Sequence, residues 1–212
     1  MGVPSRIRIA VALLIASVGA ACSASGGPGA PSPAPAAQAA RPAPAPNPGD
    51  VHFLSGMIHH HAQALAMSAL VPERASSSSV GLLAERIRVS QTDEILLMQQ
   101  WLRDQGAPVP EATPGPMRMM HDGMAHDMLM PGMLSEAQMA QLEAARGVEF
   151  DRLFLEFMIM HHEGALGMVN ELFATPGAAN DDFIYKMASD TYADQGSEID
   201  RMLQMLEAMA GR

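Results

Sequence analysis

Apolar positions along the chain follow helical rather than alternating spacing, as at Met57, Ala64 and Met67. This spacing places apolar side chains on one face of a helix, so the pattern predicts amphipathic helices. Turn-forming residues separate the segments, at Pro72 and at the Thr-Pro-Gly run 175–177 among others. Four helices are expected, at residues 50–70, 79–105, 135–174 and 180–209.

The third segment has the clearest start signal. Ser135 is followed by Gln138 at the spacing of a capping box, in which each side chain bonds to the backbone of the other residue. Gly147 within the same segment predicts a bend, because glycine weakens a helix interior. No segment offers a strand candidate, so a mixed α/β fold is not expected.

The chain contains an internal repeat. Residues 50–67 align without gaps to residues 151–168, and the frame Gln-x-x-Glu-Ile-x-x-Met occurs at 91–98 and again at 195–202. Two repeated helical hairpins close naturally as a bundle, so the predicted fold class is an all-α four-helix bundle built from two hairpins. The identical pairs of the first alignment include Asp50/Asp151, Phe53/Phe154, Met57/Met158, Ile58/Ile159, His60/His161, His61/His162, Ala64/Ala165, Leu65/Leu166 and Met67/Met168.

The composition favours helices and limits the partners. Aromatic residues make up 4% of the 212 residues, which is typical of a helical rather than a strand-rich domain. The formal net charge is −10, and removal of residues 1–22, which hold two arginines and no acidic residue, would make it −12. An acidic surface disfavours nucleic acid and anionic lipid as partners.

The N-terminus has the pattern of an export signal. Arg6 and Arg8 precede the apolar run 9–18, which is too short to span a membrane, and small residues follow. The run Gly-Ala-Ala-Cys at 19–22 resembles a bacterial lipobox, which implies lipidation of Cys22 and a cell-envelope lipoprotein. The alternative is ordinary cleavage before the cysteine, which would give a periplasmic or extracellular protein. No second cysteine exists, so no disulfide framework is expected.

The rest of the chain divides into a linker and one domain. Residues 23–49 are rich in Ala, Pro, Gly and Ser, and such a segment cannot bury enough apolar surface to fold, so a disordered linker is expected. Residues 50–212 have the size of one domain. Residues 106–134 form a Met- and His-rich connection between its two hairpins.

Histidine and methionine side chains gather on the repeated helices. At about 100° per residue, Met57, His60 and His61 share one helical face, and their counterparts do the same in the second copy. Imidazole nitrogen and thioether sulfur are ligands that suit copper, and both remain usable outside the cytoplasm, where thiols are oxidised. The predicted metal ligands are Met57, His60, His61, Met67, Glu94, Met98, Met158, His161, His162, Met168, Glu198 and Met202.

These residue types also have a structural interpretation. A methionine at helical spacing usually fills the core, and a single buried histidine often only forms hydrogen bonds. Paired histidines duplicated in both halves are harder to explain as packing, because buried imidazoles without bonds or metal cost free energy. His59 has Met160 as its counterpart, so it is expected to lie outside the site, as is His52.

The connection between the hairpins is a second candidate. Residues 117–133 combine methionines and histidines with Gly and Pro and form no amphipathic stripe. We expect a flexible tract that binds soft metals, and the alternative is an apolar loop that packs on the bundle. Its predicted ligands are Met117, Met119, Met120, His121, Met124, His126, Met128, Met130 and Met133.

At these residues the sequence resembles the DUF305 family, which includes CopM-type copper-binding proteins. The segment Phe-Asp-Arg-Leu-Phe-Leu-Glu-Phe-Met-Ile-Met-His-His-Glu-Gly-Ala-Leu-Gly-Met at 150–168 is similar to the family's signature, and so is Met-Pro-Gly-Met-Leu-Ser at 130–135. The similarity covers residues 50–210. It implies a ferritin-like helical bundle and, for some members, copper or silver binding in metal resistance.

The leading hypothesis is therefore an exported, non-enzymatic protein that binds Cu(I), Cu(II) or Ag for sequestration, delivery or tolerance. Copper is the expected bound group, and a lipid anchor on Cys22 is the only membrane contact expected. No Ser/His/Asp arrangement or phosphate-binding glycine loop is present in the sequence, so no catalytic residue is predicted.

Two other hypotheses remain. The first is a ferritin-like redox enzyme with two metal ions, a class that uses Glu-x-x-His on two helices. No Glu-x-x-His occurs in the chain, although Asp50 and Asp151 could add carboxylates to Glu94 and Glu198. The second is a structural or interaction domain without metal.

Overall fold

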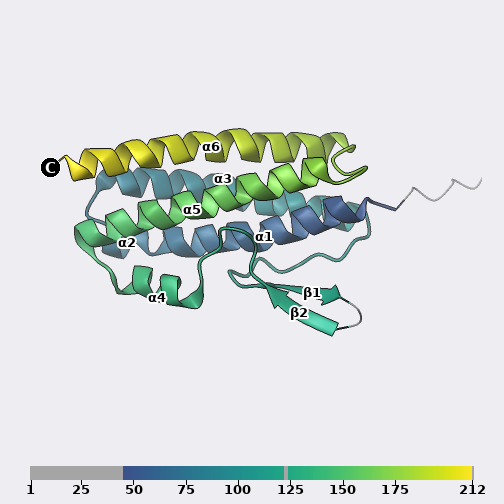
Figure 1. Ribbon diagram of the computed structural model, residues 1–212, viewed down its shortest axis with the longest axis horizontal. Helices are drawn as coiled ribbons and strands as arrows, with labels where there is room; N and C mark the ends of the chain where they lie inside the picture. Colours follow the sequence, from purple (N-terminus) through teal and green to yellow (C-terminus); the bar gives the residue numbers. More distant parts are fainter. Residues whose placement is uncertain (1–44, 122–123, 212) are drawn as a thin grey trace, which may run out of the picture. The chain divides into compact units, whose positions relative to one another are not determined.

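The computed structural model describes residues 45–121 and 124–211 (Figure 1). The predicted export signal, the lipidation candidate Cys22 and most of the predicted linker lie outside these residues. The described elements are α1 (Pro48–Ala69), α2 (Val71–Arg74), α3 (Ser78–Asp104), β1 (Met117–His121), β2 (Met124–Met128), α4 (Glu136–Ala144), α5 (Gly147–Ala174) and α6 (Asp182–Ala210).

Four long helices, α1, α3, α5 and α6, form the predicted all-α bundle (Figure 1). Helix α1 packs along α3, and α5 packs along α6, so each repeated segment is one helical hairpin. Helix α1 also contacts α5, which joins the two hairpins. Among the described residues, no helix is long and apolar enough to cross a membrane.

Two repeated aspartates tie the hairpins together at opposite ends of the bundle. Asp50, at the start of α1, accepts a hydrogen bond of 2.7 Å from the backbone N–H of Ala179, after α5. Its counterpart Asp151, at the start of α5, accepts bonds from the backbone N–H and the hydroxyl of Ser76, after α2. Helices α1 and α5 are therefore antiparallel.

These bonds also show that the two aspartates have a structural role. Both are almost fully buried. Each lies ten residues before the paired histidines of its helix, which is about 15 Å at 1.5 Å per residue. Asp50 and Asp151 therefore join loops to helices and lie outside the reach of a metal at the histidines.

The helix ends agree with the sequence signals except within the third expected helix. The side chain of Asn47 caps α1, which begins at Pro48, and the capping box of Ser135 and Gln138 is confirmed at α4. The single helix expected over 135–174 is wrong, because extended backbone at Ala145 and Arg146 separates α4 from α5. The fourth expected helix is α6, which is capped by its preceding aspartate.

The prediction that the connection contains no strand is also wrong. Strands β1 and β2 form an antiparallel hairpin in which Met117 pairs with Met128 and Arg118 with Asp127. The Arg118 and Asp127 side chains also form an ion pair of 3.2 Å across the strands. The hairpin was missed because methionines at half of its strand positions conceal the alternation that identifies a strand.

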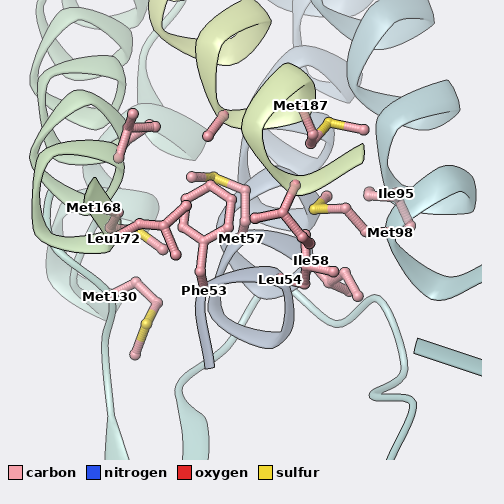
Figure 2. Packing of buried hydrophobic residues seen from close by; sticks show 14 of the residues in the cluster. Phe53, Leu54, Met57, Ile58, Ile95, Met98, Met130, Met168, Leu172 and Met187 are labelled. Atoms are coloured by element: carbon pink, nitrogen blue, oxygen red, sulfur yellow. The ribbon is translucent and has the colours of Figure 1, made fainter. Parts of the chain in front are cut away.

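The apolar core consists of two clusters separated along α1 and α5 by histidines. The first contains Phe53, Met57 and Ile58 at the start of α1, together with Leu172 at the end of α5 (Figure 2). The second contains the opposite ends of the same helices, with Phe154 as the counterpart of Phe53. The repeat in the sequence is thus a repeat in the core, and the histidines lie at its centre.

Candidate metal centre

Four histidines from two helices meet in the middle of the bundle. His60 and His61 of α1 and His161 and His162 of α5 all have no exposed surface. The ring centroids of His60 and His161 lie 3.7 Å apart across the two hairpins. Within each pair the centroids are 6.4 Å and 6.2 Å apart. The two halves therefore share one histidine cluster, a point that the sequence left open.

A glutamate from the second long helix of each hairpin, α3 or α6, bonds to the second histidine of each pair. Nε2 of His61 lies 2.5 Å from Oε2 of Glu94, and Nε2 of His162 lies 2.7 Å from Oε2 of Glu198. A carboxylate accepts hydrogen bonds, so Nε2 carries the proton and donates. Nδ1 of each ring makes no hydrogen bond, as in the carboxylate–histidine pairs that orient metal ligands.

Most nitrogens of the cluster have no partner among the described residues. Nε2 of His60 donates to the carbonyl oxygen of Pro131 at 3.0 Å, and its Nδ1 makes no bond. Nδ1 of His61 and of His162 are also without partners, and so are both nitrogens of His161. A buried polar atom without a bond costs about 1–3 kcal/mol, so the cluster is unfavourable unless a further group binds it.

Burial also keeps the central rings neutral. Burial, together with the neighbouring His61 and His162, lowers the pKa of His60 to about 3. The pKa of His161 is likewise well below its ordinary value, chiefly because of burial and then because of His60. Neutral imidazole is the form that binds metal, so these rings offer lone pairs at neutral pH without competition from protons.

Six predicted methionine ligands flank the cluster within the apolar core. Met57, Met98 and Met168 belong to the first core cluster, and Met67, Met158 and Met202 to the second. All six are buried. Met57 and Met158 come one turn before the histidine pairs, which places them on the same helical face as the histidines.

No three His, Cys, Asp or Glu side chains of the described residues have the arrangement of an assembled metal site. The cluster instead brings imidazole rings from α1 and α5 together, with methionines of the two core clusters on either side along these helices. Monovalent copper favours soft donors such as thioethers.

A short strap, residues 130–134, covers the histidines between α1 and α5. Besides the His60 bond, Gln63 holds it through two bonds to the backbone of Leu134, at 3.0 Å and 2.6 Å. Gly132 has a φ of +77°, and a Cβ there would lie 2.6 Å from the Met160 carbonyl oxygen. Sequence reasoning missed Gln63 and Gly132 as residues that close the site, and the Pro-Gly pair was the available signal.

The Met-rich connection does not form one cluster. Met117, Met130 and Met133 are buried against the first core cluster, whereas Met124, His126 and Met128 are exposed. Met119, Met120 and His121 lie in β1, and their side chains are outside the description. The tract thus combines packing and solvent exposure, where the sequence suggested one or the other.

His52 and His59, which were predicted to lie outside the site, are not part of the histidine cluster. His59 bonds through Nδ1 to the carbonyl oxygen and the hydroxyl of Thr113, at 3.0 Å and 3.2 Å. His52 is exposed at the start of α1. His59 therefore serves as a structural control for its neighbour His60.

The fold and the cluster together define the class of protein, a four-helix bundle with paired histidines from two repeated hairpins at its centre. The model of the family described as "Domain of unknown function (DUF305)" matches residues 50–206, and the chain belongs to this family. No curated protein matches the chain.

Several solved structures share the fold. A DUF305 protein from Streptomyces coelicolor, described as a candidate secreted protein, has 28% identity and a TM-score of 0.65, with 76% of this chain and 94% of that chain covered. A DUF305 fragment from Deinococcus radiodurans has 31% identity and a TM-score of 0.64, with 78% and 99% covered. CopM in its Cu(II)-bound form has 28% identity and a TM-score of 0.57, with 75% and 96% covered. CopM has also been solved in Cu(I)-bound and Ag-bound forms.

Proposed function

We propose that this protein binds copper, and silver as its analogue, at the four-histidine cluster, and that it serves in sequestration, delivery or tolerance. The observation that carries the proposal is that Nδ1 of His60, His61 and His162 and both nitrogens of His161 are buried without partners. A soft monovalent ion would occupy lone pairs that are otherwise a cost to the fold.

The proposal assigns different parts to the residues. The four histidines supply the nitrogen donors. Glu94 and Glu198 orient His61 and His162 and fix their tautomer, instead of binding the ion themselves. Met57 and Met158, on the same helical faces as the histidines, are the candidates for a sulfur ligand. Met67, Met98, Met168 and Met202 are the other predicted methionine ligands, and their thioethers lie in the apolar core on either side of the cluster.

The relatives support the choice of metal. CopM, whose structures were solved with Cu(I), Cu(II) and Ag, has the same fold over 75% of this chain. A di-iron or di-manganese centre is less well matched, because both glutamates are bonded to histidines and both aspartates to loops. The proposed activity is binding and involves no catalytic residue.

Export and lipidation form the second part of the proposal. The secretion described for the Streptomyces relative supports an exported protein. A lipid on Cys22 would place the domain at the cell envelope at the end of the linker 23–49. Mass spectrometry of the purified mature protein tests this, since a lipidated N-terminal cysteine adds the mass of a diacylglycerol, whereas a Cys22→Ser variant lacks it.

A metal titration tests the binding proposal. Cu(I), Ag(I), Zn(II) and Fe(II) are titrated into the protein against a competing chelator, and into a His61→Ala/His162→Ala variant. We expect tight Cu(I) and Ag(I) binding, and the variant should lose the equivalent of metal that the histidine cluster binds. His59→Ala is the matched control, because His59 is adjacent in sequence but bonded to Thr113, and it should keep the affinity. Unchanged binding in the double variant would contradict the proposal, and Fe(II) binding with oxygen consumption would favour the enzyme.

A further inference from the structure

A pocket of about 320 Å³ lies beside the strap, between the start of α1 and the end of α5. Its lining contains three methionines, Met128, Met130 and Met168, and the exposed imidazole of His52. Phe53 and Leu172 form its apolar wall, and Figure 2 shows both beside Met130 and Met168. The pocket therefore gathers thioethers from β2, the strap and α5 with a histidine from α1.

One of the positions at which the two copies of the repeat differ lies beside the two buried methionines of this pocket. Gly56 stands where the second copy has Phe157. A Cβ at Gly56 would lie 2.7 Å from Sδ of Met130 and 3.3 Å from the Cε methyl of Met168. The lack of a side chain thus lets two methionines from different elements, the strap and α5, pack against α1.

The three sulfurs extend from solvent to the core. Met128 is 44% exposed, whereas Met168 and Met130 are 7% and 4% exposed. Three methionines beside a histidine are soft and borderline donors of the kind that Cu(I) and Ag(I) prefer. Glu171, which also lines the pocket, adds a carboxylate that favours a cation.

This pocket is separate from the histidine cluster. Met168 follows His161 by seven residues on α5, which corresponds to about 10 Å along the helix. One ion cannot bind both groups at that separation. The two sites are nevertheless joined by the strap, because Met130 precedes Pro131, whose carbonyl oxygen bonds to His60.

We propose that this pocket is a second, solvent-facing site for a soft monovalent cation, with Met128, Met130, Met168 and His52 as ligands. The proposal rests on the proposed function only in taking Cu(I) as the ion that the protein handles. It reassigns Met168 from the surroundings of the cluster to the pocket, and it gives His52 a metal-binding part.

Methyl NMR with Ag(I) as the probe tests the proposal. The protein is labelled with 13C at the methionine methyl groups, and the signals are assigned with single Met→Leu variants. Ag(I) should shift the signals of Met128, Met130 and Met168 both in the native protein and in the His61→Ala/His162→Ala variant. The Met128→Leu/Met130→Leu variant should bind one Ag(I) fewer. Met187→Leu, a buried core substitution outside the pocket lining, should bind as the native protein does.

A Gly56→Ala variant removes no ligand but places a methyl against the sulfur of Met130. We expect it to weaken binding at the pocket by about tenfold, in the range seen when groups that position metal ligands are lost. Pocket signals that do not respond to Ag(I), or that respond only when the histidines are intact, would overturn the second site. Loss of the histidine site alone, with the pocket response retained, would refute only the proposed function.

Discussion

His161 gives the sharpest test of whether the histidine cluster is built for binding rather than for stability. It is fully buried, and neither ring nitrogen has a protein partner. Replacement by Leu relieves the desolvation cost of an imidazole that has no hydrogen bond, which is about 1–3 kcal/mol. The change of shape, including the lost contact with the ring of His60, costs about 1–2 kcal/mol. The metal-free His161→Leu protein should therefore lie between about 1 kcal/mol less stable and about 2 kcal/mol more stable than the native protein.

The same substitution should sharply weaken copper binding. Loss of a direct nitrogen donor is expected to lower the Cu(I) affinity by at least about a hundredfold, because removal of indirect groups alone costs about 10–100-fold. Urea unfolding of the metal-free protein and a Cu(I) competition titration measure the two effects. The combination of the two results is diagnostic. A substitution at an ordinary core residue would lower the stability and leave the Cu(I) affinity unchanged.

His59→Leu is the matched control for this test. His59 is also buried, but its Nδ1 bonds to Thr113. Its replacement should lower stability by about 1 kcal/mol, the typical worth of a hydrogen bond, and should leave the Cu(I) affinity unchanged. A His161→Leu protein that is destabilised by more than about 2 kcal/mol, or that keeps its Cu(I) affinity, would refute the reasoning.

Three further predictions concern the same structure. Because the unfolded chain protonates His60 near pH 6.5 and the folded protein only near pH 3, metal-free stability should fall as the pH drops between these values, by about 2 kcal/mol at pH 5 in urea unfolding. Gly132→Ala should lower the thermal midpoint, since it combines a positive φ with a clash against α5, worth about 1–3 kcal/mol. Asp151→Ala should cost about 1–3 kcal/mol in urea unfolding through its lost bonds to Ser76, whereas exposed Asp200→Ala should change little.

The local features of this fold could be read from the sequence. Helical spacing and turn residues identified the four long helices, and the gapless repeat identified the two hairpins. Ser135 and Gln138 predicted the cap of α4, because a cap depends only on residues within one turn. The paired histidines and the family signature followed from the same local patterns.

The tertiary structure alone decided how these elements combine. The contact between the rings of His60 and His161 depends on the antiparallel packing of α1 against α5, and residues about one hundred positions apart carry no local signal of it. The same holds for the strap bonded to Gln63 and for the methionines packed against Gly56, since both need contacts between separate elements. The sequence by itself thus determined which ligand types are present, and the packing of two hairpins determined which of them face one another, because helical periodicity specifies a face but not the neighbour that covers it.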